Sequence, residues 1–317
     1  MDQILITGAL GQLGTELIPE LHKVYGTSNV LATDLKQENT TLECIYEPLD
    51  VLNAKSFSRL VKKYRITQVY HLAAILSANG ENDPKQAWQV NMNSLLNALE
   101  ICRSMGVKKL FWPSSIGVFG PETPNQNTPQ FTIMNPNTVY GISKLAGERW
   151  CEYYHHKFGL DVRSLRYPGL IGYKSLPGGG TTDYAVDIYH SAIAKAKYTC
   201  FLKADTRLPL MYIPEAVAAT LELMDANADK LRVRSSYNLA GLSLTPRDIA
   251  NSINRYINNF SITYKPDYRQ HIADSWPNSI DDSYARTDWD WESIYTLDDI
   301  TEDMLKNLRN DHKPLVK

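Results

Sequence analysis

The stretch Ile4-Leu-Ile-Thr-Gly8-Ala-Leu-Gly11-Gln-Leu-Gly14 places three glycines between a short apolar run and a segment of helical periodicity. Glycine lets a backbone turn tightly and approach a pyrophosphate without interference from a Cβ atom. The free N–H groups and the positive dipole end of the following helix then stabilise the phosphate charge. The alternative is an ordinary tight turn before a closely packed helix. The context of strand, turn and helix favours a dinucleotide site, with cofactor contacts from Gly8, Gly11, Gln12, Leu13 and Gly14.

A carboxylate follows the second expected strand, where Asp34 lies 20 positions beyond Gly14. A carboxylate at this place accepts hydrogen bonds from the ribose hydroxyls of adenosine. The 2′-phosphate of NADP would meet like charge there, and no arginine stands beside Asp34 to bind it. Asp34 therefore predicts NAD as the cofactor. Its simpler interpretation is a polar residue at a strand end or a helix cap.

Short apolar runs alternate with longer helical segments up to residue 168. The expected strands are 3–7, 30–33, 68–72, 109–112 and 162–166, and the expected helices are 12–24, 55–64, 85–105 and 139–157. This alternation is typical of βαβ units around a parallel sheet whose strands are buried on both faces. The predicted class is α/β, a Rossmann-type doubly wound parallel sheet formed mainly by residues 1–168.

The pattern becomes looser in residues 169–317. It contains three consecutive glycines at 178–180, helical segments at 183–195 and 214–225, and a tail rich in Trp, Asp and Tyr. No internal repeat or low-complexity linker sets this part off from the first. We expect a smaller C-terminal α/β region that binds the substrate, with the chain crossing between the two regions in places.

The composition restricts the partners and the compartment. Hydrophobic residues make up 43% of the chain, charged residues 21%, and the formal net charge is -2, as in an ordinary globular protein. Binding to nucleic acid would require a basic patch, and Lys62-Lys63 and Lys108-Lys109 are only short pairs. Four separated cysteines without CxxC spacing favour reduced thiols and a cytoplasmic location. With no basic leader before Ile4 and no apolar run of about 18 residues, we expect neither secretion nor a membrane span.

The segment Tyr140-Gly-Ile-Ser-Lys144 lies in an amphipathic helical stretch, and its i,i+4 spacing puts the phenol and the ammonium on one face. A free tyrosine titrates near ~10, and an adjacent cation lowers such a pKa by about 1–3 units. The pair therefore predicts a phenolate that acts as a general base. The spacing alone is common in surface helices, so the assignment depends on the rest of the chain.

Several motifs together resemble the extended short-chain dehydrogenase/reductase family over most of the chain. They are the glycine loop, Asp34, Asp50-Val51, His71-Leu-Ala-Ala74, Asn91, Pro113-Ser-Ser-Ile-Gly-Val-Phe-Gly120 and Tyr140-Gly-Ile-Ser-Lys144. The resemblance implies a parallel sheet of about seven strands and a catalytic centre of Ser115, Tyr140 and Lys144, in which the lysine also binds the nicotinamide ribose. It further implies cofactor contacts from Asp50, Val51, Leu72, Ala73, Ala74, Asn91 and Tyr167, the first two beside the adenine.

Each of these assignments has a structural alternative. Ser114 and Ser115 could merely end a strand, and Asn91 could be an ordinary polar helix residue. His71 could be a core histidine with satisfied hydrogen bonds, which is the interpretation we favour.

The second half resembles the short-chain type of L-threonine 3-dehydrogenase, a group within that family. The residues that carry this resemblance are Pro177-Gly-Gly-Gly-Thr-Thr-Asp-Tyr-Ala-Val-Asp187, Ser275-Trp-Pro277, Asp288-Trp-Asp-Trp291, Arg207-Leu-Pro-Leu-Met-Tyr-Ile-Pro-Glu215 and Arg166-Tyr-Pro-Gly169. Many sugar-nucleotide members of the family have an asparagine where this chain has Gly169. The resemblance implies L-threonine as the substrate, with contacts from Ser77, Ser115, Tyr140, Gly179, Gly180, Thr181, Thr182 and Trp276.

The glycine-rich stretch leads into an expected helix whose first amides could hold a small carboxylate. Alternatively, Thr182 or Asp183 could satisfy the start of that helix. Trp276 could close the pocket, or it could simply pack on the domain.

Other classes of function stay open at this stage. They are a UDP-sugar epimerase or dehydratase of the same family and a non-catalytic NAD-sensing module, although Ser115, Tyr140 and Lys144 disfavour the latter. Zinc-dependent alcohol dehydrogenases also oxidise threonine, but His22, His190 and His155-His156 lack matching thiol or carboxylate spacing, so we expect no metal. The family resemblance also suggests a homodimer joined through the 85–105 and 139–157 helices, whose periodicity would equally suit helices buried inside one subunit.

Overall fold

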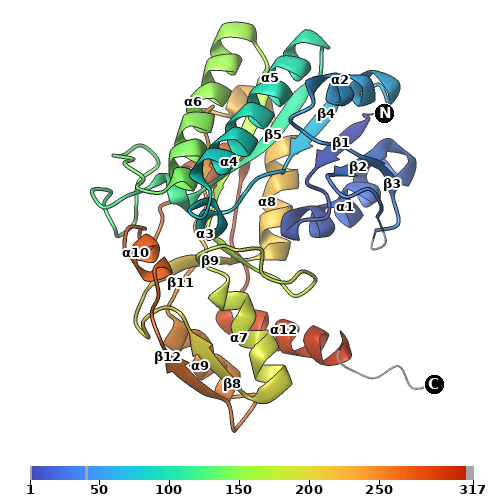
Figure 1. Ribbon diagram of the computed structural model, residues 1–317. Helices are drawn as coiled ribbons and strands as arrows, with labels where there is room; N and C mark the ends of the chain where they lie inside the picture. Colours follow the sequence, from blue (N-terminus) through green and yellow to red (C-terminus); the bar gives the residue numbers. More distant parts are fainter. Residues whose placement is uncertain (1, 40–41, 312–317) are drawn as a thin grey trace, which may run out of the picture.

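The computed structural model of the protein describes residues 2–39 and 42–311. Within these residues seven parallel strands form one sheet in the order β10-β6-β5-β4-β1-β2-β3 (Figure 1). The strands are β1 (Ile4–Thr7), β2 (Val30–Asp34), β3 (Ile45–Pro48), β4 (Gln68–His71), β5 (Lys109–Ser115), β6 (Asp161–Tyr167) and β10 (Tyr237–Asn238). The predicted Rossmann-type fold is confirmed, and all five predicted strands belong to this sheet.

Successive side chains along each strand point to opposite faces of the sheet, and each face packs in its own hydrophobic core. Ile4 and Ile6 of β1 pack in the core that contains α1 (Gln12–Tyr25) and α8 (Ile213–Asp225). Leu5 faces the other core, which is covered by α2 (Ala54–Lys63), α5 (Ser94–Ser104) and α6 (Val139–Phe158). The carboxyl ends of the strands thereby form one edge, where ligands bind in sheets of this type.

The helix expected over residues 85–105 is present and contains a π-helical turn. It consists of α4 (Pro84–Trp88), a π-helical turn at Gln89–Asn93, and α5. Within the wide turn, Asn91 Oδ1 accepts a hydrogen bond from Ile75 N at 2.8 Å, and Nδ2 donates to Ile75 O at 3.0 Å and Ser143 Oγ at 3.3 Å. The predicted helical segment is therefore confirmed over residues 84–104, and the π turn within it directs Asn91 at the chain that follows β4.

A smaller region lies below the sheet in Figure 1. Its two sheets have the orders β11-β9-β7 and β12-β8. The strands are β7 (Gly169–Ile171), β8 (Lys197–Cys200), β9 (Leu208–Tyr212), β11 (Leu242–Leu244) and β12 (Ser261–Tyr264), and the helices are α7 (Tyr184–Lys195), α9 (Pro246–Asn254), α10 (Arg269–Ala273) and α12 (Leu297–Asp311). Helix α11 (Ser283–Trp289) instead packs in the core that contains α1 and α8, beside β10. The helices predicted at 183–195 and 214–225 are confirmed as α7 and α8.

The chain crosses back from the second half into the first region. Strand β10 pairs with β6, through Tyr237 with Leu165 and Asn238 with Arg166. Helix α8 packs in the same core as α1. The division at residues 168 and 169 stays a prediction, and these two elements show that residues after it complete the central sheet and its cover. No helix in residues 2–39 and 42–311 is long and apolar enough to cross a membrane.

Candidate active site

The glycine loop between β1 and α1 has no room for side chains. Gly8 has φ +68°, and a Cβ atom there would lie 2.7 Å from Ala73 N. A Cβ atom on Gly14 would lie 2.5 Å from Ala9 O, and the Gly11 amide donates to Gly8 O at 3.1 Å. The loop therefore packs directly on the Ala73 backbone after β4, and the resulting backbone cradle fits a pyrophosphate group.

Asp34 ends β2 beside this loop. Its Oδ2 accepts a hydrogen bond from Leu10 N at 3.0 Å, and its Oδ1 accepts one from Leu35 N at 2.8 Å. The carboxylate thus holds the glycine loop against the end of β2, at the place where a ribose would be bound. The sequence suggested only the ribose contact, because hydrogen bonds to loop amides leave no pattern in the residue order.

The other predicted cofactor residues lie along the same edge of the sheet. Asp50 is exposed and its Oδ1 accepts from Leu52 N at 2.9 Å, while Val51 O accepts from Asn97 Nδ2 at 3.0 Å. Leu72 N donates to Thr7 O at 3.1 Å and thereby continues the β1–β4 ladder. Tyr167 differs, because its hydroxyl contacts Thr220 Oγ1 on α8 and packs away in the core between the sheet and that helix.

Ser115 and Tyr140 meet where β5 ends and α6 begins. Ser115 is the last residue of β5, and its Oγ accepts a hydrogen bond from Gly117 N at 3.1 Å. The same hydroxyl lies beside Tyr140, close enough to favour the ionised phenol by hydrogen bonding. Gly117 lies against the phenol ring, since a Cβ atom there would lie 3.2 Å from Tyr140 Cδ1 and Cε1. Burial raises the pKa of Tyr140 to about 12, although the Ser115 hydrogen bond lowers it in part. The expectation that the neighbouring lysine depresses this pKa was wrong for the protein without ligand, because loss of solvent dominates.

Lys144 lies one turn further along α6 and is also buried. Its Nζ donates to Pro113 O at 2.6 Å and lies 5.5 Å from the centre of the Tyr140 ring. Burial lowers the pKa of Lys144 to about 7, and the opposing effects of Cys151 and Glu148 are smaller. The ammonium is therefore close to its deprotonation point near neutral pH.

His71 confirms the structural interpretation. It is 1% exposed, with Nδ1 at 2.8 Å from Thr7 Oγ1 and Nε2 at 3.0 Å from Ser94 Oγ. Burial, with a smaller repulsion from Lys144, lowers the pKa of His71 to about 3, so the imidazole is neutral. It connects β1, β4 and α5 beneath the cofactor edge.

A buried ion pair lies behind the candidate catalytic residues, and sequence reasoning missed it. Arg166 Nε and Nη2 donate to the two oxygens of Glu148 at 2.8 and 2.7 Å, and Ser114 Oγ donates to Glu148 Oε1 at 2.6 Å. Glu148 stands four residues after Lys144 on α6, and this spacing was the available signal. Ser114 is thereby committed to the ion pair, which leaves Ser115 as the serine beside Tyr140.

Two of the predicted substrate residues, Ser77 and Thr181, are in contact near the start of α6. Ser77 Oγ accepts from Thr181 N at 3.1 Å and lies 3.1 Å from Thr181 Oγ1. Ser77 begins α3 (Ser77–Gly80), and Glu81 directly after it accepts from Val139 N at 2.8 Å. Because Val139 precedes Tyr140, the 77–81 segment connects the 178–182 loop to the candidate catalytic helix.

The glycine-rich loop satisfies its own amides. Asp183 Oδ2 accepts from Gly179 N and Gly180 N, each at 2.8 Å. Its side chain makes no cap hydrogen bond to α7, so the alternative in which Asp183 satisfies the start of that helix was wrong. Burial raises the pKa of the Asp183 carboxyl, with the two amides opposing this. Asp183 was not predicted as a site residue. The contacts of Gly179 and Gly180 with a substrate stay predictions that require these bonds to open.

Trp276 packs rather than standing open at the site. It is 7% exposed and belongs to the hydrophobic cluster that contains Tyr184 and Ile280. The Asp288-Trp-Asp-Trp291 segment is also structural: Asp288 accepts from Arg232 Nε and Tyr237 Oη, both at 2.7 Å, and Trp291 is 1% exposed. The 288–291 segment is thus hydrogen-bonded to Tyr237 of β10 through Asp288.

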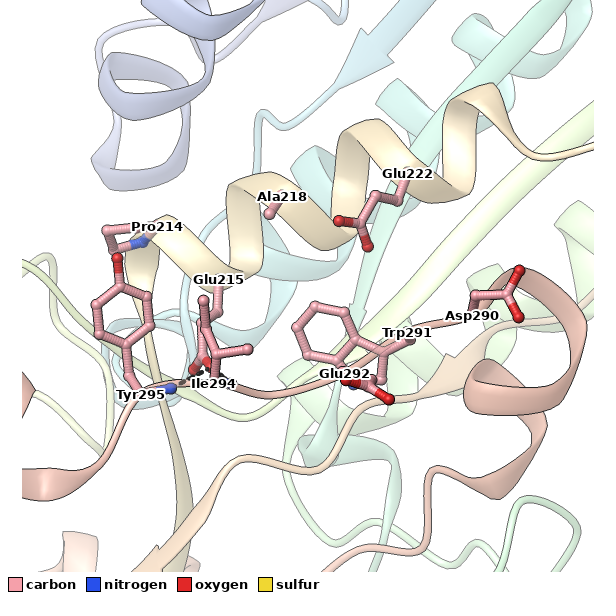
Figure 2. Close-up of a pocket in the computed structure, with 9 residues that line it drawn as sticks. All are labelled: Pro214, Glu215, Ala218, Glu222, Asp290, Trp291, Glu292, Ile294 and Tyr295. Atoms are coloured by element: carbon pink, nitrogen blue, oxygen red, sulfur yellow. Dashed lines mark hydrogen bonds between the residues drawn. The ribbon is translucent and has the colours of Figure 1, made fainter.

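A cavity of about 320 Å³ lies elsewhere, between α8 and the tail (Figure 2). Its wall includes Glu215, whose Oε1 accepts from Ser293 Oγ at 2.9 Å, Ile294 N at 2.6 Å and Tyr295 N at 3.1 Å. Glu215 therefore fixes the backbone of the tail, and this cavity contains none of the predicted site residues. The lining residues are Pro214, Glu215, Ala218, Glu222, Asp290, Trp291, Glu292, Ile294 and Tyr295.

Comparison with known proteins agrees with the site. Residues 4–240 match the NAD dependent epimerase/dehydratase family. An uncharacterized epimerase/dehydratase of Staphylococcus haemolyticus is 46% identical over 310 residues, which cover 96% of this chain and 97% of that one. The chain therefore belongs to the NAD-dependent epimerase/dehydratase family. This confirms the extended short-chain dehydrogenase/reductase prediction and NAD as the cofactor.

Two solved structures are similar over nearly the whole chain. The holo form of a GalE-like L-threonine dehydrogenase from Cupriavidus necator is 54% identical, with a TM-score of 0.95 over 96% of this chain and 99% of that one. The apo form of a monomeric L-threonine 3-dehydrogenase from a metagenome is 47% identical, with a TM-score of 0.96 over 98% of this chain and 100% of that one.

Proposed function

We propose that this protein oxidises the 3-hydroxyl of L-threonine to 2-amino-3-oxobutanoate and so takes part in threonine catabolism. The chain is an NAD-dependent dehydrogenase by family and by its structural neighbours. The threonine hypothesis is supported by similarity to L-threonine dehydrogenases over 96% and 98% of this chain.

The contact between Gly169 and Thr182 supports threonine over a sugar nucleotide as the substrate. A Cβ atom on Gly169 would lie 2.6 Å from Cβ and Cγ2 of Thr182 and 2.7 Å from Leu210 Cδ2. An asparagine at position 169 would therefore displace the Thr181-Thr182 segment that Ser77 holds. The glycine leaves Thr182 in place beside α7, where a small amino acid can be bound.

The proposed chemistry uses three side chains. Ser115 holds the substrate hydroxyl and Tyr140 removes its proton, so that hydride leaves C3. Bound NAD supplies the acceptor for that hydride. Lys144 stabilises the phenolate as an ammonium, and its remaining donors suit the nicotinamide ribose.

The two pKa values give this mechanism a specific pH dependence. Lys144 and Tyr140 titrate near 7 and 12, so the pair loses its first proton mainly from the lysine. The reactive arrangement, an ionised Tyr140 with a charged Lys144, has the same number of protons as that majority form. Its population therefore rises with pH up to the lysine pKa and is constant above it. We expect kcat/KM for threonine to rise up to about pH 7 and then level off.

The deciding experiment supplies purified protein with NAD and L-threonine and follows NADH absorbance. The product is identified as 2-amino-3-oxobutanoate or as aminoacetone, its decarboxylation product. Serine, which lacks the methyl group, is expected to react at least tenfold more slowly, because a small apolar contact contributes about 1–3 kcal/mol. Epimerisation of a UDP-sugar with no reaction of threonine would replace the substrate assignment. NAD binding without any turnover would indicate a sensing module instead.

We also propose a cytoplasmic homodimer. The cytoplasmic location rests on the separated cysteines, and Cys44, Cys102, Cys151 and Cys200 are all free thiols in the structure. The dimer rests on the exposed apolar residues of the outer face of α6.

A further inference from the structure

Trp112 lies directly beside the Lys144 ammonium. Lys144 Nζ is 4.5 Å from the centre of the Trp112 ring, and the same nitrogen donates to the carbonyl of the next residue, Pro113, at 2.6 Å. The tryptophan is 3% exposed, as is Lys144. An aromatic face attracts a cation through its quadrupole, and this attraction is larger where water is excluded.

The position of the indole is fixed by packing on α6. A Cβ atom on Gly147 would lie 2.4 Å from Cη2 and 2.7 Å from Cζ2 of Trp112. The glycine therefore admits the ring against the helix backbone, one turn after Lys144. Leu95 and Cys151 belong to the same hydrophobic cluster, so the ring is enclosed in the core between the sheet and its helices.

None of the other charged and titratable groups described around Lys144 gives its ammonium a negatively charged partner of its own. On α6, Glu148 is already committed to Arg166, Cys151 is a buried thiol whose pKa burial raises, and the Tyr140 phenol is neutral at neutral pH. From β4, His71 is neutral because its pKa is about 3. No carboxylate among the described residues forms an ion pair with Lys144.

We propose that the indole face of Trp112 holds Lys144 in its charged form, which makes Trp112 a positioning residue of the catalytic centre. The inference rests on the proposed role of Lys144 in the reaction. The ammonium is the charged form, so removal of the ring lowers the pKa of Lys144. A cation–π contact in a desolvated site corresponds to a shift of about one pH unit.

This shift has a signature that loss of packing alone does not produce. Well below the lysine pKa, the population of the reactive arrangement depends only on Tyr140. Trp112→Leu is therefore expected to leave kcat/KM unchanged near pH 5.5. In the plot of kcat/KM against pH, the rising part should move about one pH unit lower, and the plateau at pH 8.5 should fall about tenfold. Trp112→Phe keeps an aromatic face and should recover most of the plateau.

The measurement is kcat/KM for L-threonine at saturating NAD between pH 5.5 and 8.5. Trp289→Leu is the matched control, because Trp289 is a buried tryptophan in the other core, and it should lower thermal stability without moving the rising part of the plot. A profile for Trp112→Leu that is lowered equally at every pH, or whose rising part is unmoved or moves to higher pH, would overturn the proposal.

A second readout does not depend on turnover. In protein labelled with ¹³Cε-lysine, the Lys144 resonance can be assigned by its loss in Lys144→Arg and titrated by NMR. The midpoint is expected about one unit lower in Trp112→Leu than in the wild type. An unchanged midpoint overturns the role of Trp112. If threonine is inert but the midpoint shifts, the substrate assignment fails while the inference about Trp112 stands.

Discussion

At the scale of single residues, the hydroxyl of Tyr140 is the atom on which the proposed proton transfer depends. Tyr140→Phe removes this hydroxyl and keeps the ring that packs on Gly117. We expect kcat for threonine to fall by about 10²–10⁴-fold, the usual contribution of a general base, while NAD affinity and melting temperature change little. Steady-state kinetics with calorimetric NAD binding would test this, and near-normal turnover would exclude Tyr140 as the base.

Asp34 should determine the choice of cofactor. Since a hydrogen bond to a charged group contributes about 1.5–3 kcal/mol, we expect kcat/KM to be at least about tenfold higher with NAD than with NADP. Asp34→Ala should weaken NAD use and reduce this preference, partly because Leu10 N and Leu35 N lose their acceptor. Asp34→Asn is the matched control, since it keeps an acceptor oxygen and removes the charge. Equal efficiency of the two cofactors in the wild type would contradict the assignment.

Residue chemistry could be predicted where it follows from sequence spacing. The glycine loop, Asp34 and the Tyr140 and Lys144 pair are set by local order along the chain, and the structure brings each to the carboxyl edge of the sheet. The protonation states could not be predicted, because they depend on burial contributed by distant elements. Trp112 beside Lys144 and Arg166 beside Glu148 are contacts of the same kind, formed only when β5, β6 and α6 pack together.

At the scale of elements, long periodic helices and apolar strands were predictable and short irregular elements were not. Strands β1, β2, β4, β5 and β6 have short segments rich in apolar or β-branched residues or, in β6, apolar residues that alternate with polar ones, whereas β10 has two residues and depends on pairing with β6. The π turn at Gln89–Asn93 leaves the apolar periodicity of its helix intact, so only the tertiary bonds of Asn91 reveal it. The same limit applies to Asp183, whose bonds to Gly179 and Gly180 fold the loop back on itself.

The contact between β7 and the start of α7 gives an element-scale prediction. Gly169→Ala places a methyl group against Thr182 and Leu210, and such overpacking costs about 1–3 kcal/mol. We expect kcat/KM for threonine to fall at least tenfold through a higher KM, with NAD affinity preserved. Kinetics and a thermal melt would be compared with Gly106→Ala, where a Cβ atom has nothing within 4 Å and φ is +69°. That control should lose stability through backbone strain and keep its KM for threonine. An unchanged KM in Gly169→Ala would contradict the argument that a larger residue, such as asparagine, at position 169 displaces Thr182.

At the scale of the whole molecule, the outer face of α6 is an exposed apolar surface, and we propose that a second copy of the chain covers it. Ile142, Trp150 and Tyr153 are 46%, 40% and 48% exposed and follow one side of the helix. A hollow of about 420 Å³ lies on the same side, between Trp150, Tyr153, Ala146 and Arg149. Exposed patches of this kind mark protein interfaces, and a twofold dimer would cover both copies at once.

We therefore expect the wild type to have about twice the chain mass of 35.9 kDa in light scattering. The double variant Trp150→Asp/Tyr153→Asp should be monomeric, because burying unpaired carboxylates opposes association. Ile294→Asp is the control that should leave the mass unchanged, because Ile294 is 73% exposed and lies in the segment after α11, away from α6. A single-chain mass for the wild type would contradict the dimer and match the neighbour that is described as monomeric.

The return of the chain into the central sheet limits how this fold can be recombined with its relatives. A fragment that ends at residue 168 would leave the edge of β6 open and would lack α8 over the apolar face of the sheet. A chimera with a foreign substrate specificity must therefore keep the native piece from Ile213 to Asn238 and exchange the segments on either side of it. The smaller region is thus built from two chain segments on either side of Ile213–Asn238, so it cannot be exchanged as one continuous piece.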